Sequence, residues 1–287
     1  IILNPYIGLY ITALLIPIYA LNTSESGGTL VRNTGILTFV AWFLSQMVQR
    51  KTLHKLVDTS ITLPMGIFWL VCAVSVLWSA NRNWWFTGFY TFTQLILFTF
   101  MLINLMNSFA RIEQFFLFFS IGSLMNAGIT MVQFYEQYGT HSGIFRVSGG
   151  ASGANLTGSI LVTTLPVVFF FAEKRNAFSR FYGYFGVVML TLGITLTLSR
   201  TGIILMGLFF LWKLVERRKL NFRMIGMFVL LAIAITVLYQ FAPWELLQRR
   251  FVTLPSDLSL EGNDRTWLIK IAFQSITANP FGYGVRN

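Results

Sequence analysis

Nine apolar runs follow one another along the chain, and short segments between them contain most of the charged residues. Each run approaches or exceeds the roughly 20 residues that a helix needs to cross a bilayer. The runs predict membrane-spanning helices at about residues 4–21, 35–48, 61–78, 86–106, 114–135, 156–172, 182–198, 201–215 and 224–241. The expected fold is therefore all-α, with a polytopic membrane helix bundle at residues 1–241 and a more polar segment at residues 242–287.

The composition agrees with a membrane protein, because 55% of the residues are hydrophobic and only 11% are charged. A soluble domain of this length would carry roughly 25% charged residues. The single cysteine, Cys72, lies inside an apolar run, so it has no partner for a disulfide within the chain.

The basic residues alternate along the chain, which fixes an orientation in the membrane. Twelve of the 21 lysines and arginines follow the second, fourth, sixth and eighth runs, and only four follow the first, third, fifth and seventh. The positive-inside rule then predicts a cytoplasmic N-terminus and an outer location for residues 242–287. Because the net charge of +11 is spread between apolar runs, membrane lipids are the expected partner and nucleic acid is not.

Residues 182–215 predict a tight hairpin instead of one long helix. A single helix of 34 residues would be about 51 Å long, whereas the hydrocarbon core is about 30 Å thick. Basic residues flank both ends, so both ends should be cytoplasmic. The turn is expected at Ser199-Arg200-Thr201-Gly202, at or slightly below the outer membrane surface. The Arg200 guanidinium would then lie near hydrocarbon, where a charge costs free energy. Arg200 is therefore either a functional residue or one whose side chain reaches lipid phosphate.

A glycine-rich stretch from Arg146 to Asn155 directly precedes the sixth run. Glycines such as Gly149 let the backbone approach a ligand, and successive N–H groups can form an anion-binding nest. Asn155 is a possible N-cap of the helix that follows. The alternative interpretation of the stretch is an ordinary flexible loop.

A third outward arginine, Arg265, lies at the start of a predicted helix at residues 264–278, which ends before Asn279-Pro280. It is either a ligand-binding residue or part of a solvated helix end. Three guanidinium groups suit a diphosphate, because each planar fork matches two phosphate oxygens and stays charged. No motif for a metal site is present, so neither a metal nor another cofactor is expected.

An ordered set of short motifs now resembles a known family. The motifs are Arg146-x-x-Gly149 with Asn155, the Ser199-Arg200-Thr201-Gly202 turn, Arg265-x-Trp267, and Asn279-Pro280-Phe281-Gly282-Tyr283-Gly284. Their order and the predicted topology resemble the O-antigen ligase and O-antigen polymerase superfamily of bacterial inner-membrane glycan transferases. The likeness covers nearly the whole chain.

This resemblance implies a fold similar to that of the GT-C glycosyltransferases, with about twelve helices, of which about nine are present. It implies metal-independent transfer of a glycan from undecaprenyl diphosphate to an acceptor on the periplasmic side, either lipid A-core or a growing polysaccharide. Arg146, Arg200 and Arg265, with Gly149, Asn155 and Ser199, would bind the donor. A histidine of a large periplasmic loop would activate the acceptor.

That histidine is expected beyond Asn287, so no catalytic residue is expected within the chain, which we interpret as an inactive fragment when alone. Two other functions remain open at this point. A transporter of a small solute or envelope precursor would have a polar path through the bundle. A non-catalytic subunit of an envelope-assembly complex would have outer arginines that share no pocket.

Overall fold

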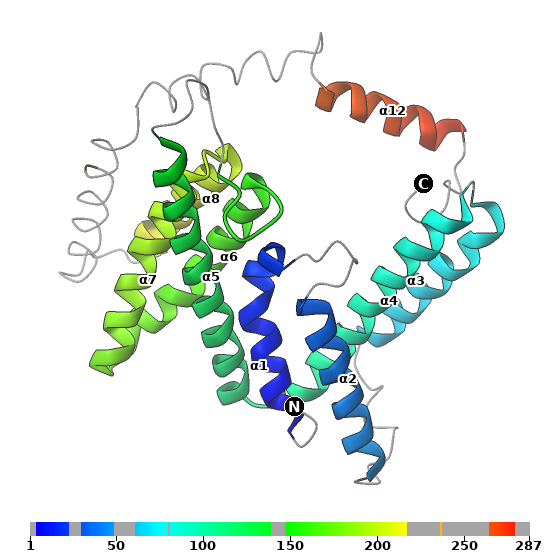
Figure 1. Cartoon of the computed structure of the whole chain (residues 1–287), viewed down its shortest axis with the longest axis horizontal. Helices are drawn as coiled ribbons and strands as arrows, with labels where there is room; N and C mark the ends of the chain where they lie inside the picture. Colours follow the sequence, from blue (N-terminus) through cyan, green and yellow to red (C-terminus); the bar gives the residue numbers. More distant parts are fainter. Residues whose placement is uncertain are drawn as a thin grey trace. The chain divides into compact units, whose positions relative to one another are not determined.

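The computed structural model describes residues 4–22, 30–48, 61–79, 81–138, 147–216, 236 and 264–278, and every regular element in these ranges is helical (Figure 1). The elements are α1 (Pro5–Leu15), η1 (Ile16–Asn22), α2 (Leu30–Val48), α3 (Thr62–Val74), η3 (Ser75–Trp78), α4 (Arg82–Leu105), α5 (Phe109–Tyr138), α6 (Ala154–Glu173), α7 (Ala177–Leu196), α8 (Arg200–Glu216) and α12 (Asp264–Ala278).

The first eight predicted runs each correspond to a helix, and the ninth falls almost wholly outside the described residues. Four of the helices, α4 to α7, are long and apolar enough to cross a membrane by length and composition. The prediction of an all-helical membrane protein is therefore confirmed. Nine spans, a GT-C-like fold and a domain boundary after residue 241 remain predictions.

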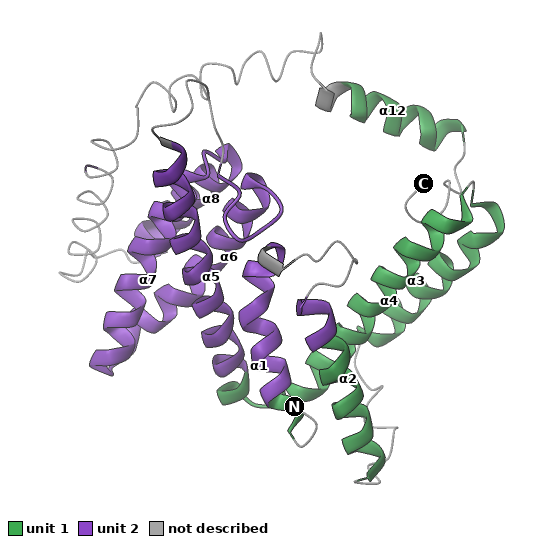
Figure 2. Cartoon of the chain, in the orientation of Figure 1, with its two compact units in different colours: residues 1–6, 35–111, 253–287 green, residues 7–34, 112–252 purple. Residues whose placement is uncertain are grey.

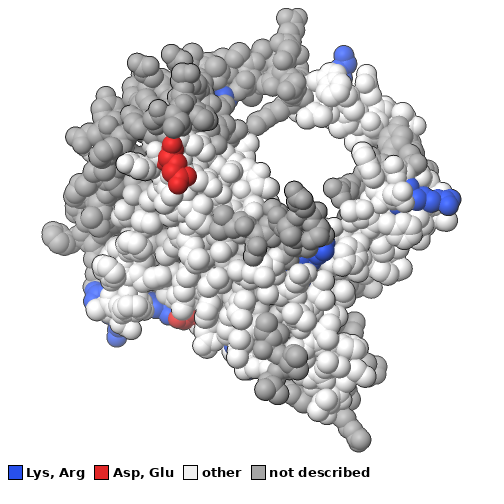
Figure 3. All heavy atoms as spheres, viewed as in Figure 1, with Lys and Arg blue, Asp and Glu red and all other residues white. Residues whose placement is uncertain are grey.

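Many large apolar side chains are exposed on the helices, including α7 and α8, as expected where a helix faces lipid. Phe181 is 70% exposed, and Leu208 and Trp212 are each 54% exposed. Figure 3 shows one face of the molecule, on which lysine, arginine, aspartate and glutamate of the described residues occupy only a few places.

Asparagine caps determine where two of the helices begin. The side-chain oxygen of Asn81 accepts hydrogen bonds from the backbone N–H groups of Asn83 and Trp84 at the start of α4. Asn176 does the same for the N–H of Phe178, so α7 begins at Ala177, five residues before the predicted start.

The chain forms two compact units, which Figure 2 colours separately. Unit 1 contains residues 1–6, 35–111 and 253–287. Within it, α3 packs against α4 through aromatic residues. The Trp69 indole N–H donates to the Thr93 hydroxyl at 3.0 Å, and the Phe68 and Phe92 rings meet edge to face. The α3–α4 pair is therefore a helical hairpin held by aromatic packing and a side-chain hydrogen bond.

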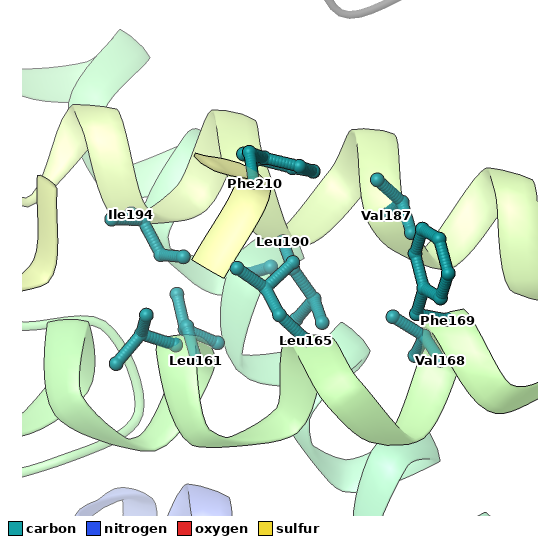
Figure 4. Close-up of a cluster of buried hydrophobic side chains, with 10 residues drawn as sticks. Leu161, Leu165, Val168, Phe169, Val187, Leu190, Ile194 and Phe210 are labelled. Atoms are coloured by element: carbon teal, nitrogen blue, oxygen red, sulfur yellow. The ribbon is translucent and has the colours of Figure 1, made fainter. Parts of the chain in front are cut away.

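Unit 2 contains residues 7–34 and 112–252, and its apolar core lies between α6, α7 and α8. Figure 4 shows leucine, valine and isoleucine side chains of α6 and α7 pointing toward one another, with Phe210 of α8 above them. Close approach of α6 and α7 depends on Gly183, because a Cβ there would lie 2.1 Å from the backbone nitrogen of Ala172.

Helix α1 packs along α5 in the same unit. A Cβ added to Gly122 of α5 would lie 2.0 Å from the backbone oxygen of Leu14, so the two backbones are in direct contact. Tyr10 stacks on Phe118, and its hydroxyl donates to the side-chain oxygen of Gln114 at 2.7 Å. These contacts make α1 run parallel to α5 and bring η1 alongside the middle of α5.

Candidate functional site

The helix directions in unit 2 bring several chain segments to one end. Their residue contacts show that helix α1 runs parallel to α5, that α6 returns antiparallel to α5, and that α7 and α8 each reverse direction again. Helices α5 and α7 therefore finish where α6 and α8 begin. We call residues 147–153 and 197–200, which connect these helices, the loop end of unit 2.

Two contacts fix the register between α5 and α6. Ser123 forms a hydrogen bond with Thr164 at 2.9 Å, and Glu113 forms an ion pair with Lys174. The two contacts are ten residues apart on each helix, and a further ten residues bring Gln133 of α5 level with the first residue of α6, Ala154. The segment that precedes α6 therefore lies beside α5 and not beyond its end.

A polar stripe on α5 faces that segment. Asn126, Thr130 and Gln133 are spaced by four and three residues, which places them on one face of the helix. Asn126 and Thr130 are fully buried. Amide groups in a membrane-spanning helix are costly unless they form hydrogen bonds, so the partners of this stripe define its role.

Gln133 forms a pair of hydrogen bonds with the backbone of Gly149. Its side-chain oxygen accepts from the Gly149 N–H at 2.9 Å, and its side-chain NH₂ donates to the Gly149 carbonyl at 3.1 Å. One glutamine thus satisfies both backbone polar groups of Gly149, which is buried.

Asn126 joins the loop end to η1. Its side-chain oxygen accepts from the Gly150 N–H at 2.7 Å, and its NH₂ donates to the Pro17 carbonyl at 2.7 Å. The Ala20 N–H completes the arrangement by donating to the Gly150 carbonyl at 3.0 Å. Asn126 lies seven residues before Gln133, about 10 Å along the α5 axis. The loop therefore turns into the bundle and not away from it.

Gly149 adopts a backbone conformation that favours glycine, with φ of 61°. A Cβ at this position would lie 2.4 Å from the Asn126 side-chain oxygen and 2.5 Å from the Thr130 hydroxyl. Conformation and space both require glycine here.

The turn between α7 and α8 is buried and closely tied to α6. Ser199, which is fully buried, precedes α8 and accepts a hydrogen bond from the Gly202 N–H at 3.4 Å. Its hydroxyl also donates to the side-chain oxygen of Asn155 at 3.4 Å. Leu198 has a positive φ of 52°, which is uncommon for a residue with a side chain. The turn is thus held in one conformation against the start of α6.

Arg200 is the first residue of α8 and is partly exposed. Helices α6 and α8 both begin at the loop end, and each helix N-terminus carries partial positive charge. A Cβ on Gly158 of α6 would lie 2.9 Å from the Ser199 Cβ, so the two helix starts are close together. The guanidinium and the two helix ends make this part of unit 2 electrostatically suited to an anion.

Of the six predicted binding residues, Gly149, Ser199 and Arg200 lie at the loop end of unit 2, and Asn155 lies in the first turn of α6, directly after it. Arg146 lies outside the described residues. Arg265 is the second residue of α12, in unit 1, and its side chain is not among those described. Convergence of the three arginines therefore remains a prediction.

Three local interpretations of the sequence are wrong. Gly153 and not Asn155 is the N-cap of α6, so Asn155 lies within the first turn. The N–H groups of Gly149 and Gly150 already donate to α5 side chains, so these two glycines do not form an open anion nest. The hairpin turn lies at residues 197–199, and Arg200 to Gly202 begin α8, because the Ser199 hydroxyl caps that helix.

The polar stripe of α5 was not among the features predicted from the sequence. The signal was present, because asparagine, threonine and glutamine recur at helical spacing inside an otherwise apolar run. Averaging hydropathy over a whole span hides such residues. Polar residues that share one face of a spanning helix indicate a buried partner.

Comparison with known proteins bears on the second half of this site. Residues 185–287 match the model of a protein family described as O-antigen ligase. The predicted family resemblance is confirmed. The match includes Ser199, Arg200 and Arg265 and begins after Gly149 and Asn155. A search of curated proteins and a search of solved structures each gave no match.

The O-antigen ligase match and the apolar helices together support a membrane protein of lipopolysaccharide biosynthesis. The part of the chain that carries the match begins in α7 and includes the α7–α8 turn and α12. The buried Ser199 and the helix start at Arg200 therefore belong to the segment with the family likeness.

Proposed function

We propose that the chain contributes the donor site of a membrane glycan transferase of the O-antigen ligase or polymerase type. The donor is a glycan on undecaprenyl diphosphate, and the acceptor is lipid A-core or a growing polysaccharide. The reaction takes place on the periplasmic face of the inner membrane, in a GT-C-like bundle whose N-terminus is cytoplasmic. The observation that carries the proposal is the family match across the turn that presents Arg200.

Arg200 is the residue that would bind the diphosphate most directly. Its fixed positive charge and planar fork match phosphate oxygens, and the starts of α6 and α8 add partial positive charge on the same side. As the acceptor oxygen attacks the sugar, the bond to the diphosphate breaks and negative charge grows on the leaving group. A preorganised cation lowers the energy of that charge.

The neighbouring polar groups would orient the diphosphate. The hydroxyl of Ser199 lies between the start of α8 and the Asn155 side chain, and Asn155 is exposed in the first turn of α6. Gly149 contributes through the loop conformation that it permits. Arg146 and Arg265 are proposed to complete the charge around the diphosphate, with no metal or other cofactor.

Arg200→Ala tests the proposal, with farnesyl diphosphate as a short polyprenyl diphosphate probe and the full native protein in detergent. A charged hydrogen bond contributes about 1.5–3 kcal/mol, so we expect binding roughly ten- to a hundred-fold weaker. The matched control is Arg175→Ala, which removes the same charge from an exposed position between α6 and α7, at the other end of unit 2.

Farnesyl monophosphate provides a second control, because the proposed site should prefer the diphosphate. The proposal is wrong if Arg200→Ala and Arg175→Ala change the diphosphate affinity equally, or if the unmodified protein does not bind the probe. Retained binding of the control variant together with loss in Arg200→Ala supports a local anion site over a general effect of charge.

A second function, transport, is favoured by one observation, the loop that turns into the bundle beside α5. Irregular backbone inside a membrane protein often borders a substrate path. This function predicts uptake of a lipid-linked or soluble envelope precursor into proteoliposomes. Uptake without glycan transfer would favour transport, and transfer without uptake would exclude it.

A further inference from the structure

The side-chain amide groups of α5 support the buried part of the glycine-rich loop. Gly149, Gly150 and Ala151 are buried, whereas Ser152 is exposed. Gln133 and Asn126 together satisfy the N–H groups of Gly149 and Gly150 from within the bundle. The loop is therefore built into unit 2 by side chains that precede it in the chain.

These hydrogen bonds satisfy backbone groups of the loop that are buried away from water. Backbone N–H and C=O groups that lie away from water must find partners within the protein. Buried side-chain amides have the same need, since burying an amide without a hydrogen-bond partner is unfavourable. The glutamine, the asparagine and the loop backbone satisfy one another, so each fixes the geometry of the rest.

The asparagine also extends the support to η1. Pro17 and Ala20 belong to η1. The Pro17 carbonyl accepts a hydrogen bond from Asn126, and the Ala20 N–H donates to the carbonyl of Gly150, the residue whose N–H Asn126 binds. Tyr19 in the same element bonds through its hydroxyl to Ser152. Three segments that are far apart in the sequence thus meet at a single buried amide.

We infer that Asn126 and Gln133 are positioning residues that hold loop 147–153, and through it the start of α6, ready to bind the diphosphate of a lipid-linked donor. The inference rests on the proposed function. A loop already ordered without ligand avoids the loss of affinity that follows when the binding-competent conformation is only fractionally populated.

Gln133→Met tests the inference, because methionine has a similar length and makes neither hydrogen bond. If the loop then keeps its binding conformation about a tenth of the time, affinity for farnesyl diphosphate falls about ten-fold. Hydrogen exchange of the Gly149 and Gly150 amides should become faster in the same variant without any ligand. Asn126→Leu should have at least as large an effect on both measurements.

Ser123→Ala is the matched control, since it removes a buried hydrogen bond between α5 and α6 without touching the loop. A merely structural role for Gln133 predicts that Gln133→Met and Ser123→Ala lower thermal stability and affinity in parallel. A positioning role predicts that only Gln133→Met and Asn126→Leu weaken farnesyl diphosphate binding at equal thermal stability.

The experiments distinguish the donor site from the positioning role of Asn126 and Gln133. If Arg200→Ala weakens binding but Gln133→Met does not, the donor site stands and the positioning role is wrong. If Gly149 and Gly150 exchange at the same rate in wild type and Gln133→Met, the positioning role is also wrong. If the unmodified protein does not bind farnesyl diphosphate, both the donor site and the positioning role are wrong.

Discussion

Single residues determine the conformation of the loop end, and at Gly149 the structure admits no residue with a Cβ without strain. Its left-handed backbone alone would cost a residue with a Cβ roughly 1–2 kcal/mol. Two oxygen atoms, one from Asn126 and one from Thr130, lie within 2.5 Å of the place that such a Cβ would occupy. The glycine is therefore required by its neighbours on α5 as much as by its own dihedral angle.

Gly149→Ala should accordingly lower the apparent melting temperature of the protein in detergent and speed hydrogen exchange in residues 147–153. Strain and overpacking together suggest a loss of about 2–4 kcal/mol. Gly128→Ala on α5 is the control, since a Cβ there meets nothing within 4 Å. In a helix that substitution should be neutral or stabilising. Equal losses in both variants would contradict the strained-loop account.

For the helices, the hydropathy pattern predicted their existence more accurately than their first and last residues. The stretch 264–278 is a helix with the predicted bounds, and the run predicted at residues 61–78 corresponds to α3 and η3 at residues 62–78. The start of α7 was missed because the first turns contain Arg180, which lowers the apolar signal there although Asn176 caps the helix. Local capping depends on one side chain and leaves little trace in an averaged pattern.

The conformation of the loop beside α5 could not be predicted from the sequence, for a different reason. Its conformation depends on Asn126 and Gln133, which lie about twenty residues earlier in the chain. Sequence spacing indicates that these two residues share a helix face, but it does not indicate which segment covers that face. Residues that are close in sequence were recognised as a group, such as Ser199 and Arg200, whereas their contact with Asn155 required the fold.

Gly158 allows α6 to pack closely against the turn that precedes α8. A Cβ on Gly158 would lie 2.9 Å from the Cβ of Ser199 and 3.3 Å from the Thr197 hydroxyl. Gly158→Ala should therefore separate the two helix starts, destabilise the protein by about 1–3 kcal/mol and weaken farnesyl diphosphate binding. Gly207→Ala on α8, where nothing lies within 4 Å, should leave binding unchanged and should be neutral or stabilising. Thermal unfolding and ligand titration of the two variants decide the matter, and an unchanged Gly158→Ala protein would contradict the packing argument.

For the whole molecule, the proposed reaction requires that the loop end of unit 2 face the periplasm. The parallel and antiparallel order of α1 and α5 to α8 agrees with alternate crossing of a membrane. It does not by itself distinguish the two sides. The distribution of lysine and arginine predicts that the loop end faces the periplasm, because Lys174 and Arg175 lie at the opposite end of unit 2.

Cysteine labelling tests this orientation directly. The chain has one natural cysteine, so Cys72→Ala provides a background for single reporters. Ser152→Cys places a thiol at an exposed position of the loop end, and Ala177→Cys places one at the exposed start of α7 without changing any charge. In right-side-out spheroplasts, a membrane-impermeant maleimide should label the first reporter and not the second.

Permeabilised spheroplasts are the control, because both thiols should then react. The opposite pattern, with Ala177→Cys labelled in intact spheroplasts and Ser152→Cys protected, would place Arg200 and its neighbours on the cytoplasmic side. A diphosphate-linked donor presented in the periplasm could not reach them there. The labelling pattern therefore decides whether the charge alternation, the helix directions and the proposed chemistry describe one consistent molecule.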